Sequence, residues 1–405
     1  MRSPLPRLPE RDSAANVARN EMKKADAKLK PATLCVHAGA YRDEAIGAIA
    51  TPVFNASSYA YPNPTDQNIY QRYFNTPNQR VVAAKLATLE HGEDALVFGS
   101  GMAAITTTLF ALLKPGDHAV FQEDLYGGTY HFIATELTRF GIEVSFAKTG
   151  GDFAAQLRPN TKLIYVESPS NPLLRCVDLA VVAKLAKAHE LLTVIDNTFA
   201  TPINQIPLAL GIDVAVHSAT KYLNGHSDLN AGAAVASREL IARIRPCAVN
   251  HGGMLDAHAC YMLERGLKTL ALRIERQNAN TGKLASWLQQ HPAVVRVNYP
   301  GLPSHADHAV AARQMRGFGG MLSFELRDAA QANALLRHFR LATAALSLGG
   351  VETLVTSPAK TSHVKLSAAE RAAIGISDAL LRVSVGIEDV DDLIADFEQA
   401  LKTQR

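Results

Sequence analysis

From about residue 80 to residue 250, the chain alternates short apolar runs with longer amphipathic stretches. The short runs are typical of buried strands, and the amphipathic stretches, such as Leu179–His189, are typical of helices. Six strands are predicted in this part of the chain: His118–Gln122, Glu143–Ala147, Leu163–Glu167, Thr193–Asp196, Val214–His217 and Ala233–Ser237. Because strands that alternate with helices usually pair in parallel, we expect a mostly parallel sheet with helices on both faces.

A long helical pattern, Ala259–Gln290, follows and leads into a second, smaller unit. Four strands are predicted there, with helices between them: Val294–Asn298, Gly320–Leu326, Ala342–Ser347 and Leu381–Val385. We therefore predict an α/β protein with a larger, ligand-binding domain at residues 76–257 and a smaller C-terminal α/β domain at residues 258–405.

The first 75 residues show less periodicity than the rest of the chain. Residues 1–33 are polar, with Glu21–Lys30 as a candidate for a short charged helix, and we interpret them as a flexible arm. Residues 34–75 are rich in proline and predict loops that wrap a neighbouring subunit. Residues 1–75 are thus expected to form an arm and an inter-subunit segment.

The composition excludes several classes of protein. The chain has 405 residues, of which 47% are hydrophobic, so it is long enough for two domains with ample cores. Its net charge of +3 and lack of a strong basic patch argue against nucleic-acid binding. It has no apolar run long enough to cross a membrane and no apolar signal core, so we expect a cytoplasmic protein that neither spans a membrane nor is secreted.

The cysteine and histidine positions argue against a metal site. The four cysteines, at positions 35, 176, 247 and 260, form no CxxC pair and have no zinc-binding spacing, which suits a reducing compartment. His305 and His308 are close in sequence, but no further ligands follow, and we expect them in a solvated loop.

Two polar residues follow buried strands and give the first indication of chemistry. Asp196 ends one apolar run, and Lys221 comes soon after another. Burial lowers the pKa of a lysine amine and makes it a nucleophile suited to a Schiff base. A carboxylate at the carboxyl end of a strand can hold the protonated ring nitrogen of pyridoxal 5'-phosphate (PLP). Either residue alone would be read as a surface lysine or a helix cap, but together they favour PLP.

Candidate phosphate-binding groups lie nearby in the sequence or the predicted topology. Ser218 and Thr220 place two hydroxyl groups beside Lys221. A Gly-Ser-Gly turn after Val97 opens an apolar helix that runs to about Leu113, and the free N–H groups of a helix N-terminus bind phosphate well. Such turns are common, so this motif is weak evidence by itself.

The segment around Lys221 resembles the signature of the PLP-dependent Cys/Met metabolism family. This family includes cystathionine γ-synthases, γ-lyases and β-lyases, methionine γ-lyases and O-acylhomoserine sulfhydrylases. The resemblance extends from about Leu34 to the C-terminus. It implies PLP fold type I, the arrangement of aspartate aminotransferase, with residues 76–257 as the PLP-binding domain. It also implies a homotetramer built from two catalytic dimers.

The resemblance assigns further residues to the cofactor. Gly101 and Met102 are expected to donate backbone N–H groups to the PLP phosphate, and Tyr126 to stack on the pyridine ring and take part in proton transfer. Tyr70 and Arg72 are expected to reach the phosphate in the neighbouring subunit. The turn after Arg72 reads Asn-Thr-Pro-Asn where the family usually has Asn-Pro-Thr, so the conformation of that turn is open.

Three residues are expected to bind the amino-acid substrate. By resemblance, Arg382, helped by Ser347, holds the α-carboxylate through the two parallel hydrogen bonds that a guanidinium can make. Asn171 is expected to contact both the phenolic oxygen of PLP and the same carboxylate. Lys221 then moves the α-proton, and Tyr126 is a candidate acid for the leaving group.

The positions that mark subgroups of the family do not settle the substrate. Leu346 stands where γ-synthases and γ-lyases carry a glutamate, and His131 where γ-synthases tend to have an arginine. Gly128 replaces a cysteine of methionine γ-lyases, and Leu348 a tryptophan of one branch of β-lyases.

The run Ser347–Leu354 resembles the γ-acting members. We therefore expect γ-elimination or γ-replacement on a homoserine-type amino acid, with a non-sulfur leaving group such as that of canavanine as one hypothesis. A cystathionine β-lyase that releases pyruvate and a non-catalytic PLP-binding protein are the alternatives.

Overall fold

The computed structural model describes residues 29–41, 47–61, 67–362, 364 and 367–402. Most of the predicted arm lies outside these residues, including all of the candidate helix Glu21–Lys30 except its last two positions. The described part begins with α1 (Pro31–His37) and the short 3-10 turn η2 (Gln71–Tyr73), with irregular segments between them.

The larger sheet has seven strands in the order β1-β7-β6-β5-β4-β2-β3. They are β1 (Asp94–Phe98), β2 (His118–Gln122), β3 (Glu143–Ala147), β4 (Thr161–Glu167), β5 (Leu192–Asp196), β6 (Val214–His217) and β7 (Gly232–Ala236). The six predicted strands are confirmed, with ends shifted by two residues at most. Strands β6, β5, β4, β2 and β3 run parallel, and only β7 is antiparallel to its neighbours, so the mostly parallel sheet is confirmed. Strand β1 was not predicted, because its last residues were taken for the start of the Gly-Ser-Gly turn.

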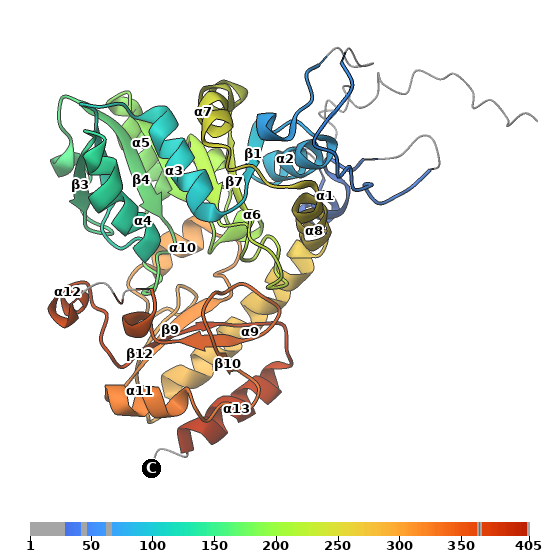
Figure 1. Cartoon of the computed structure of the whole chain (residues 1–405). Coiled ribbons are helices and arrows are strands. Elements are labelled where there is room, and N and C mark those ends of the chain that lie inside the picture. The colour runs from blue at the N-terminus through green and yellow to red at the C-terminus, as the bar shows by residue number, and fades with distance from the viewer. Residues whose placement is uncertain (1–28, 42–46, 62–66, 363, 365–366, 403–405) are drawn as a thin grey trace, which may run out of the picture.

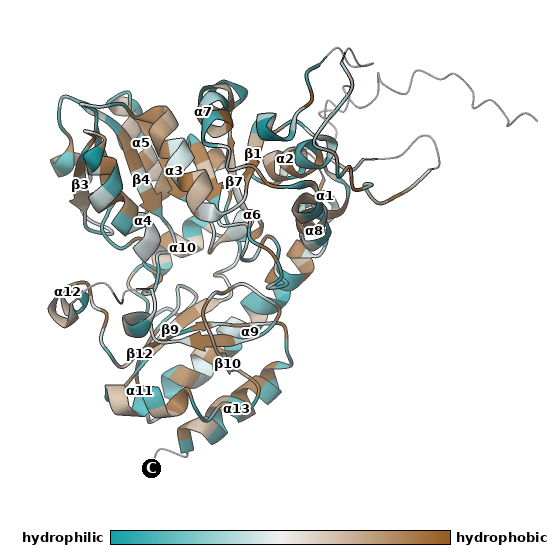
Figure 2. Cartoon of the chain, viewed as in Figure 1, coloured by the Kyte–Doolittle hydropathy of each residue, from teal (hydrophilic) through white to brown (hydrophobic). Residues whose placement is uncertain are grey.

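Helices cover both faces of this sheet (Figure 1). They are α2 (Pro77–Leu89), α3 (Gly101–Leu112), α4 (Gly127–His131), α5 (Leu179–Ala188), α6 (Thr201–Asn204), α7 (Arg238–His251) and α8 (Ala257–Leu267). Successive residues of one strand enter different cores: Phe121 packs with the α3 side, and Val120 packs with the α5 side. Because both faces are covered, the central strands are apolar at nearly every position, as Figure 2 shows.

The smaller sheet has five strands in the order β10-β11-β12-β9-β8. They are β8 (Val294–Asn298), β9 (Met321–Leu326), β10 (Thr343–Ala344), β11 (Leu354–Thr356) and β12 (Leu380–Ser384). The other helices that follow α9 (Leu270–Gln290) are α10 (His308–Gln314), α11 (Ala329–Leu335), α12 (Ala368–Ala373) and α13 (Val390–Lys402), of which α10 packs against the segment around Cys176 and Ala200 (Figure 1). Strand β11 was not predicted. The strand expected at Ala342–Ser347 is only two residues long, and Ser347 has a φ of 77°, which no strand residue adopts.

The helix predicted at Ala259–Gln290 is two helices, α8 and α9 (Leu270–Gln290). At the break, the carbonyl of Gly266 accepts hydrogen bonds from the backbone and hydroxyl of Thr269 and from the side chain of Arg273. These bonds replace the regular helical bond, and a tertiary contact of this kind leaves no mark in the hydrophobic pattern.

Several further expectations from the sequence can be compared with the structure. His305 was expected in a solvated loop, but it is only 9% exposed, and its Nδ1 accepts a hydrogen bond from the N–H of Asp307. No group of metal-binding side chains is found among the described residues. In the described part of the chain, no helix combines the length and apolar character needed to span a membrane. The domain boundary after residue 257 remains a prediction; it falls at the first residue of α8.

Candidate active site

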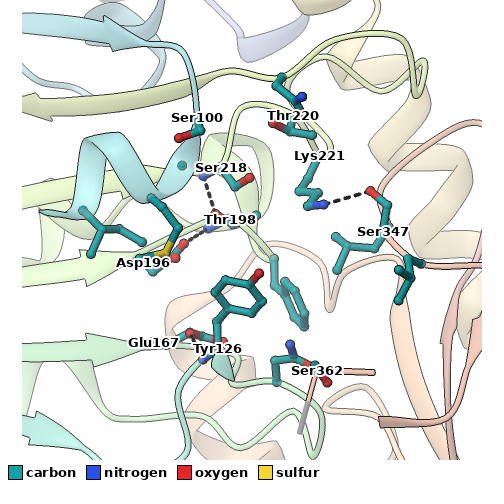
Figure 3. A pocket seen from close by; sticks show the side chains of 18 of the residues that line it. Ser100, Tyr126, Glu167, Asp196, Thr198, Ser218, Thr220, Lys221, Ser347 and Ser362 are labelled. Atoms are coloured by element: carbon teal, nitrogen blue, oxygen red, sulfur yellow. Dashed lines mark hydrogen bonds between the residues drawn. The ribbon is translucent and has the colours of Figure 1, made fainter. Parts of the chain in front are cut away.

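A cavity of about 580 Å³ lies where the carboxyl ends of the central strands face the smaller sheet. Ten of the twelve nominated residues line it: Gly101, Met102, Tyr126, Asn171, Asp196, Ser218, Thr220, Lys221, Ser347 and Arg382. They come from segments up to 281 positions apart (Gly101 to Arg382), which the parallel sheet and the adjoining β12 bring together. Figure 3 shows the side chains of Tyr126, Asp196, Ser218, Thr220, Lys221 and Ser347 around one space.

Lys221 lies on a tight turn that follows β6. Its Nζ donates a hydrogen bond to Ser347 Oγ at 2.8 Å, so the larger domain's amine meets the smaller domain's hydroxyl (Figure 3). Burial lowers the pKa of Lys221, and the positive charge of Arg382 lowers it further. Both effects enlarge the neutral fraction of the amine, which is the form that acts as a nucleophile or a base.

Asp196 and Glu167 are buried carboxylates at the ends of adjacent strands, and they pair directly in the register of β4 and β5. Burial raises the pKa of both, and the charge of Asp196 raises the pKa of Glu167 further. Asp196 accepts a hydrogen bond from the N–H of Thr198 at 3.0 Å. Among the described residues, no lysine or arginine forms an ion pair with either carboxylate. The charge of His217 lowers the pKa of Asp196, but among the described residues no ion pair with Asp196 is formed, and a protonated pyridine ring in the cavity would supply one.

The N-terminus of α3 forms another wall of the cavity. Ser100 caps it: its Oγ accepts from the N–H of Ala103, and its carbonyl accepts from the N–H of Ala104. The preceding N–H groups, those of Gly101 and Met102, donate no bond within the described residues. A Cβ on Gly101 would lie 2.7 Å from Ser218 Cβ, so the glycine lets the helix end approach Ser218 closely.

The hydroxyl group of Thr220, which we predicted to bind phosphate, already makes two hydrogen bonds within the protein. Its hydroxyl accepts from the N–H of Ala231 at 2.9 Å and donates to the carbonyl of the same residue at 3.1 Å. The hydroxyl proton is thus already used in holding the turn to β7.

Arg382 on β12 is only 6% exposed, and burial lowers the pKa of its guanidinium to about 10. Its Nη1 donates to Asn171 Oδ1 at 3.0 Å and its Nη2 to the carbonyl of Ser347 at 3.2 Å. Among the described residues, no carboxylate pairs with it. A buried arginine without an acid is costly, so a carboxylate brought by a substrate fits this position.

Tyr126 lines the cavity just before α4 and is 44% exposed. Its backbone N–H donates to Glu167 Oε2 at 2.8 Å, which ties the tyrosine to the end of β4. Its ring lies over Gly128, where a Cβ would come within 2.5 Å of the ring's Cε1. A cysteine at position 128 would therefore require Tyr126 to move.

Tyr70 and Arg72 do not line the cavity; both are exposed. Arg72 Nη1 donates to the carbonyl of Val249 at 3.0 Å, and its guanidinium lies 5.8 Å from the ring centroids of Tyr70 and Tyr73. A single chain cannot test a role in the neighbouring subunit, so that role remains a prediction.

The cavity also contains residues that sequence reasoning did not nominate, among them Ser100, Glu167, Thr198, Asn230 and Ser362. Glu167 could have been found, since it ends a predicted strand in the same way as Asp196. Ser362 could not, because it lies in an irregular segment without a motif.

The residues around the cavity fit PLP on three structural grounds: a buried carboxylate that forms no ion pair and N–H groups at a helix N-terminus that donate no bond, both within the described residues, and an amine with a lowered pKa. A family model described as Cys/Met metabolism PLP-dependent enzyme matches residues 32–402.

Individual relatives also match over nearly the whole chain. A cystathionine gamma-lyase of Bacillus subtilis is 43% identical over 92% of this chain and 100% of its own length. A cystathionine beta-lyase of Coxiella burnetii is 45% identical over 91% of this chain and 97% of its own. The solved structure of a cystathionine gamma-lyase from Lactobacillus plantarum, complexed with L-serine, superimposes with a TM-score of 0.88 at 40% identity, covering 92% of this chain and 99% of the other.

Proposed function

Because this chain belongs to the family of Cys/Met metabolism PLP-dependent enzymes, we propose that it catalyses γ-elimination or γ-replacement on a homoserine-type amino acid. The observation that carries the proposal is the buried guanidinium of Arg382, which opens into the same cavity as Lys221 and Asp196 without a carboxylate partner among the described residues. The preference for Cγ over Cβ rests on the resemblance of Ser347–Leu354 to γ-acting members.

PLP supplies an electron sink for the carbanion that forms when the substrate loses its α-proton. Arg382 binds the substrate carboxylate in a two-point fork and so directs the α-carbon toward Lys221. Lys221, with its lowered pKa, takes the α-proton. The γ-reaction also requires a second proton to leave Cβ, and the electron pair of that bond expels the γ-substituent. Asp196 holds the ring-nitrogen proton, and Tyr126 is the proposed acid at the leaving group.

The positions of the charged residues around the cavity indicate whether the leaving group can carry a positive charge. The acidic residues that line it, Asp196 and Glu167, both lie at the strand ends, and Leu346 at the opposite side is 68% exposed. A distal cation, such as the ammonium of cystathionine or the guanidine of canavanine, therefore meets no carboxylate near Leu346 among the described residues that line the cavity. We propose an uncharged leaving group as the first choice, and the canavanine hypothesis requires an acid from a neighbouring subunit.

The test is to identify the 2-oxo acid released from a panel of amino acids by the purified holoenzyme. The panel contains cystathionine, O-acetyl- and O-succinylhomoserine, methionine, cystine and canavanine, each with and without a thiol. We expect 2-oxobutanoate, or a thiol-dependent γ-product, and no product from Lys221→Ala. Pyruvate as the main product would instead favour a β-lyase, and a Lys221→Ala variant with full activity would contradict the mechanism.

Assembly and location belong to the same proposal. We infer a homotetramer made of two catalytic dimers, in which Tyr70 and Arg72 complete the phosphate site of the neighbouring subunit. We also infer a cytoplasmic location from the cysteine pattern of the sequence.

A further inference from the structure

Arg273 on α9 is a buried cation outside the cavity. Its side chain is 4% exposed, and burial lowers its pKa to about 10. Among the described residues, no carboxylate lies within ion-pair distance of the guanidinium. An arginine in such a place is costly unless its donors are satisfied in another way.

Backbone carbonyls and one hydroxyl satisfy those donors. Nη1 donates to the carbonyl of Tyr222 at 2.7 Å, and Nη2 donates to the carbonyls of Gly266 at 2.8 Å and Leu223 at 3.4 Å. Nε donates to Thr269 Oγ1 at 3.1 Å. The guanidinium therefore joins the break between α8 and α9 to the carbonyl groups of the two residues that follow Lys221.

The turn after Lys221 is packed tightly on the same side. Gly225 has a φ of 76°, and a Cβ there would come within 2.2 Å of Arg273 Cζ. A Cβ on Gly266 would lie 2.3 Å from the carbonyl oxygen of Asn224. The turn thus rests directly on Arg273 and on the end of α8.

The opposite side of the turn is closed by the segment that contains Ser347. A Cβ on Gly349 would lie 2.6 Å from the backbone nitrogen of Tyr222, and Ser347 Oγ accepts from Lys221 Nζ at 2.8 Å. The turn can therefore shift only if Arg273 releases it or if the Ser347–Gly349 segment moves as well.

We propose that Arg273 is a positioning residue for Lys221: by holding the carbonyls of Tyr222 and Leu223, it fixes the direction in which the lysine amine enters the cavity. The inference rests on the proposed role of Lys221. The geometry requires a guanidinium, because a lysine ammonium lacks the planar fork that reaches acceptors on both the turn and the helix break.

The test compares Arg273→Lys with Arg276→Lys, since Arg276 is exposed on the same helix one turn further on. Each variant is loaded with PLP, and three quantities are measured: the pH midpoint of the visible absorbance of the bound cofactor, kcat, and KM. For Arg273→Lys we expect a shifted midpoint and a kcat lowered about 10- to 100-fold, the effect of a misplaced reacting group. KM should change little, because Arg273 does not touch Arg382 or Asn171. Arg276→Lys should match the unmodified enzyme.

A milder pair covers the case in which Arg273→Lys does not fold. Thr269→Val removes the acceptor of Arg273 Nε, and Thr269→Ser retains it; we expect the midpoint to shift only in the valine variant. If Arg273→Lys folds and differs from Arg276→Lys only in melting temperature, or if Thr269→Val and Thr269→Ser have the same midpoint, the positioning role is wrong. A visible band that persists in Lys221→Ala would contradict the proposed function itself, so the two failures can be told apart.

Discussion

At the scale of single residues, the cavity combines buried charged groups that would be unfavourable in a protein interior without a ligand. Within the described part of the chain, Asp196 and Glu167 are adjacent carboxylates that form no ion pair, and Arg382 is a cation that forms no ion pair with a carboxylate. Each is explained if the missing partner arrives with a ligand: a ring N–H for Asp196 and a substrate carboxylate for Arg382. Glu167 has no such ligand partner, and its acceptor role toward Tyr126 needs only one oxygen.

Glu167→Gln is therefore expected to stabilise the apoenzyme at high pH. The folded-state pKa of Glu167 is raised, so the folded protein binds more protons than the unfolded chain, and its stability falls as pH rises above the unfolded value of about 4.3. Glutamine cannot ionise, yet its amide oxygen can still accept from the Tyr126 N–H. The melting temperature of the apoenzyme should fall less between mildly acidic and alkaline pH in Glu167→Gln than in the unmodified protein.

The matched control is Glu275→Gln, because Glu275 is an exposed glutamate on α9. It should leave the pH profile of the melting temperature unchanged. An unaltered profile in Glu167→Gln would mean that Glu167 does not hold its proton in the folded apoenzyme.

At the scale of elements, the start of α3 is the part of the fold that we propose binds the PLP phosphate. Ser100 caps this helix with a side-chain acceptor, and Ser237 caps α7 in the same way, with its Oγ accepting from the N–H of Leu240 at 3.2 Å. Of these two helices, α3 begins at the cavity, and no residue of α7 lines it. A comparison of the two helices can therefore separate the effect of a cap on stability from its effect on PLP binding.

Ser100→Ala and Ser237→Ala should each lower stability by about 1 kcal/mol, the usual effect of losing a cap. Only Ser100→Ala should also weaken PLP binding, since a frayed first turn no longer presents the N–H groups of Gly101 and Met102 to the phosphate. Denaturant unfolding of the apoenzymes and titration with PLP measure the two effects. Equal PLP affinity in both variants would argue against the proposed phosphate site.

At the scale of the whole molecule, the proposed sharing of sites between subunits predicts that two inactive variants can complement each other in a mixed dimer. Lys221→Ala removes the amine of a subunit's own cavity, whereas Arg72→Ala removes a group that we propose acts in the neighbour's cavity. In a mixed dimer, one of the two sites would lack both groups and the other would be intact.

Mixing the two inactive variants under conditions of subunit exchange should therefore restore activity to at most about one quarter of the normal specific activity, since half of the dimers are mixed and each carries one intact site. Mass spectrometry of the mixture verifies that exchange has taken place. Mixed dimers without activity would mean that Arg72 serves its own subunit or has only a structural role.

The local sequence determined much of this protein. Apolar runs such as Val214–His217 predicted the central strands because burial on both faces requires apolar side chains throughout. The Asp196 and Lys221 motifs then predicted the cofactor and the edge of the sheet at which it binds. Local signals of this kind account for four of the ten predicted residues around the cavity, Asp196, Ser218, Thr220 and Lys221, and the family resemblance supplied the other six.

Only the tertiary structure decided the rest, because the remaining features depend on contacts between distant segments. The break between α8 and α9 exists where Arg273 meets Gly266, and the sequence pattern there is that of one helix. The left-handed φ of Ser347 after a short strand and the position of Ser362 at the cavity likewise have no local signal in the sequence. Hydrophobic periodicity reports burial along one element, whereas the direction of the Lys221 amine depends on hydrogen bonds from a helix 52 residues away in the chain.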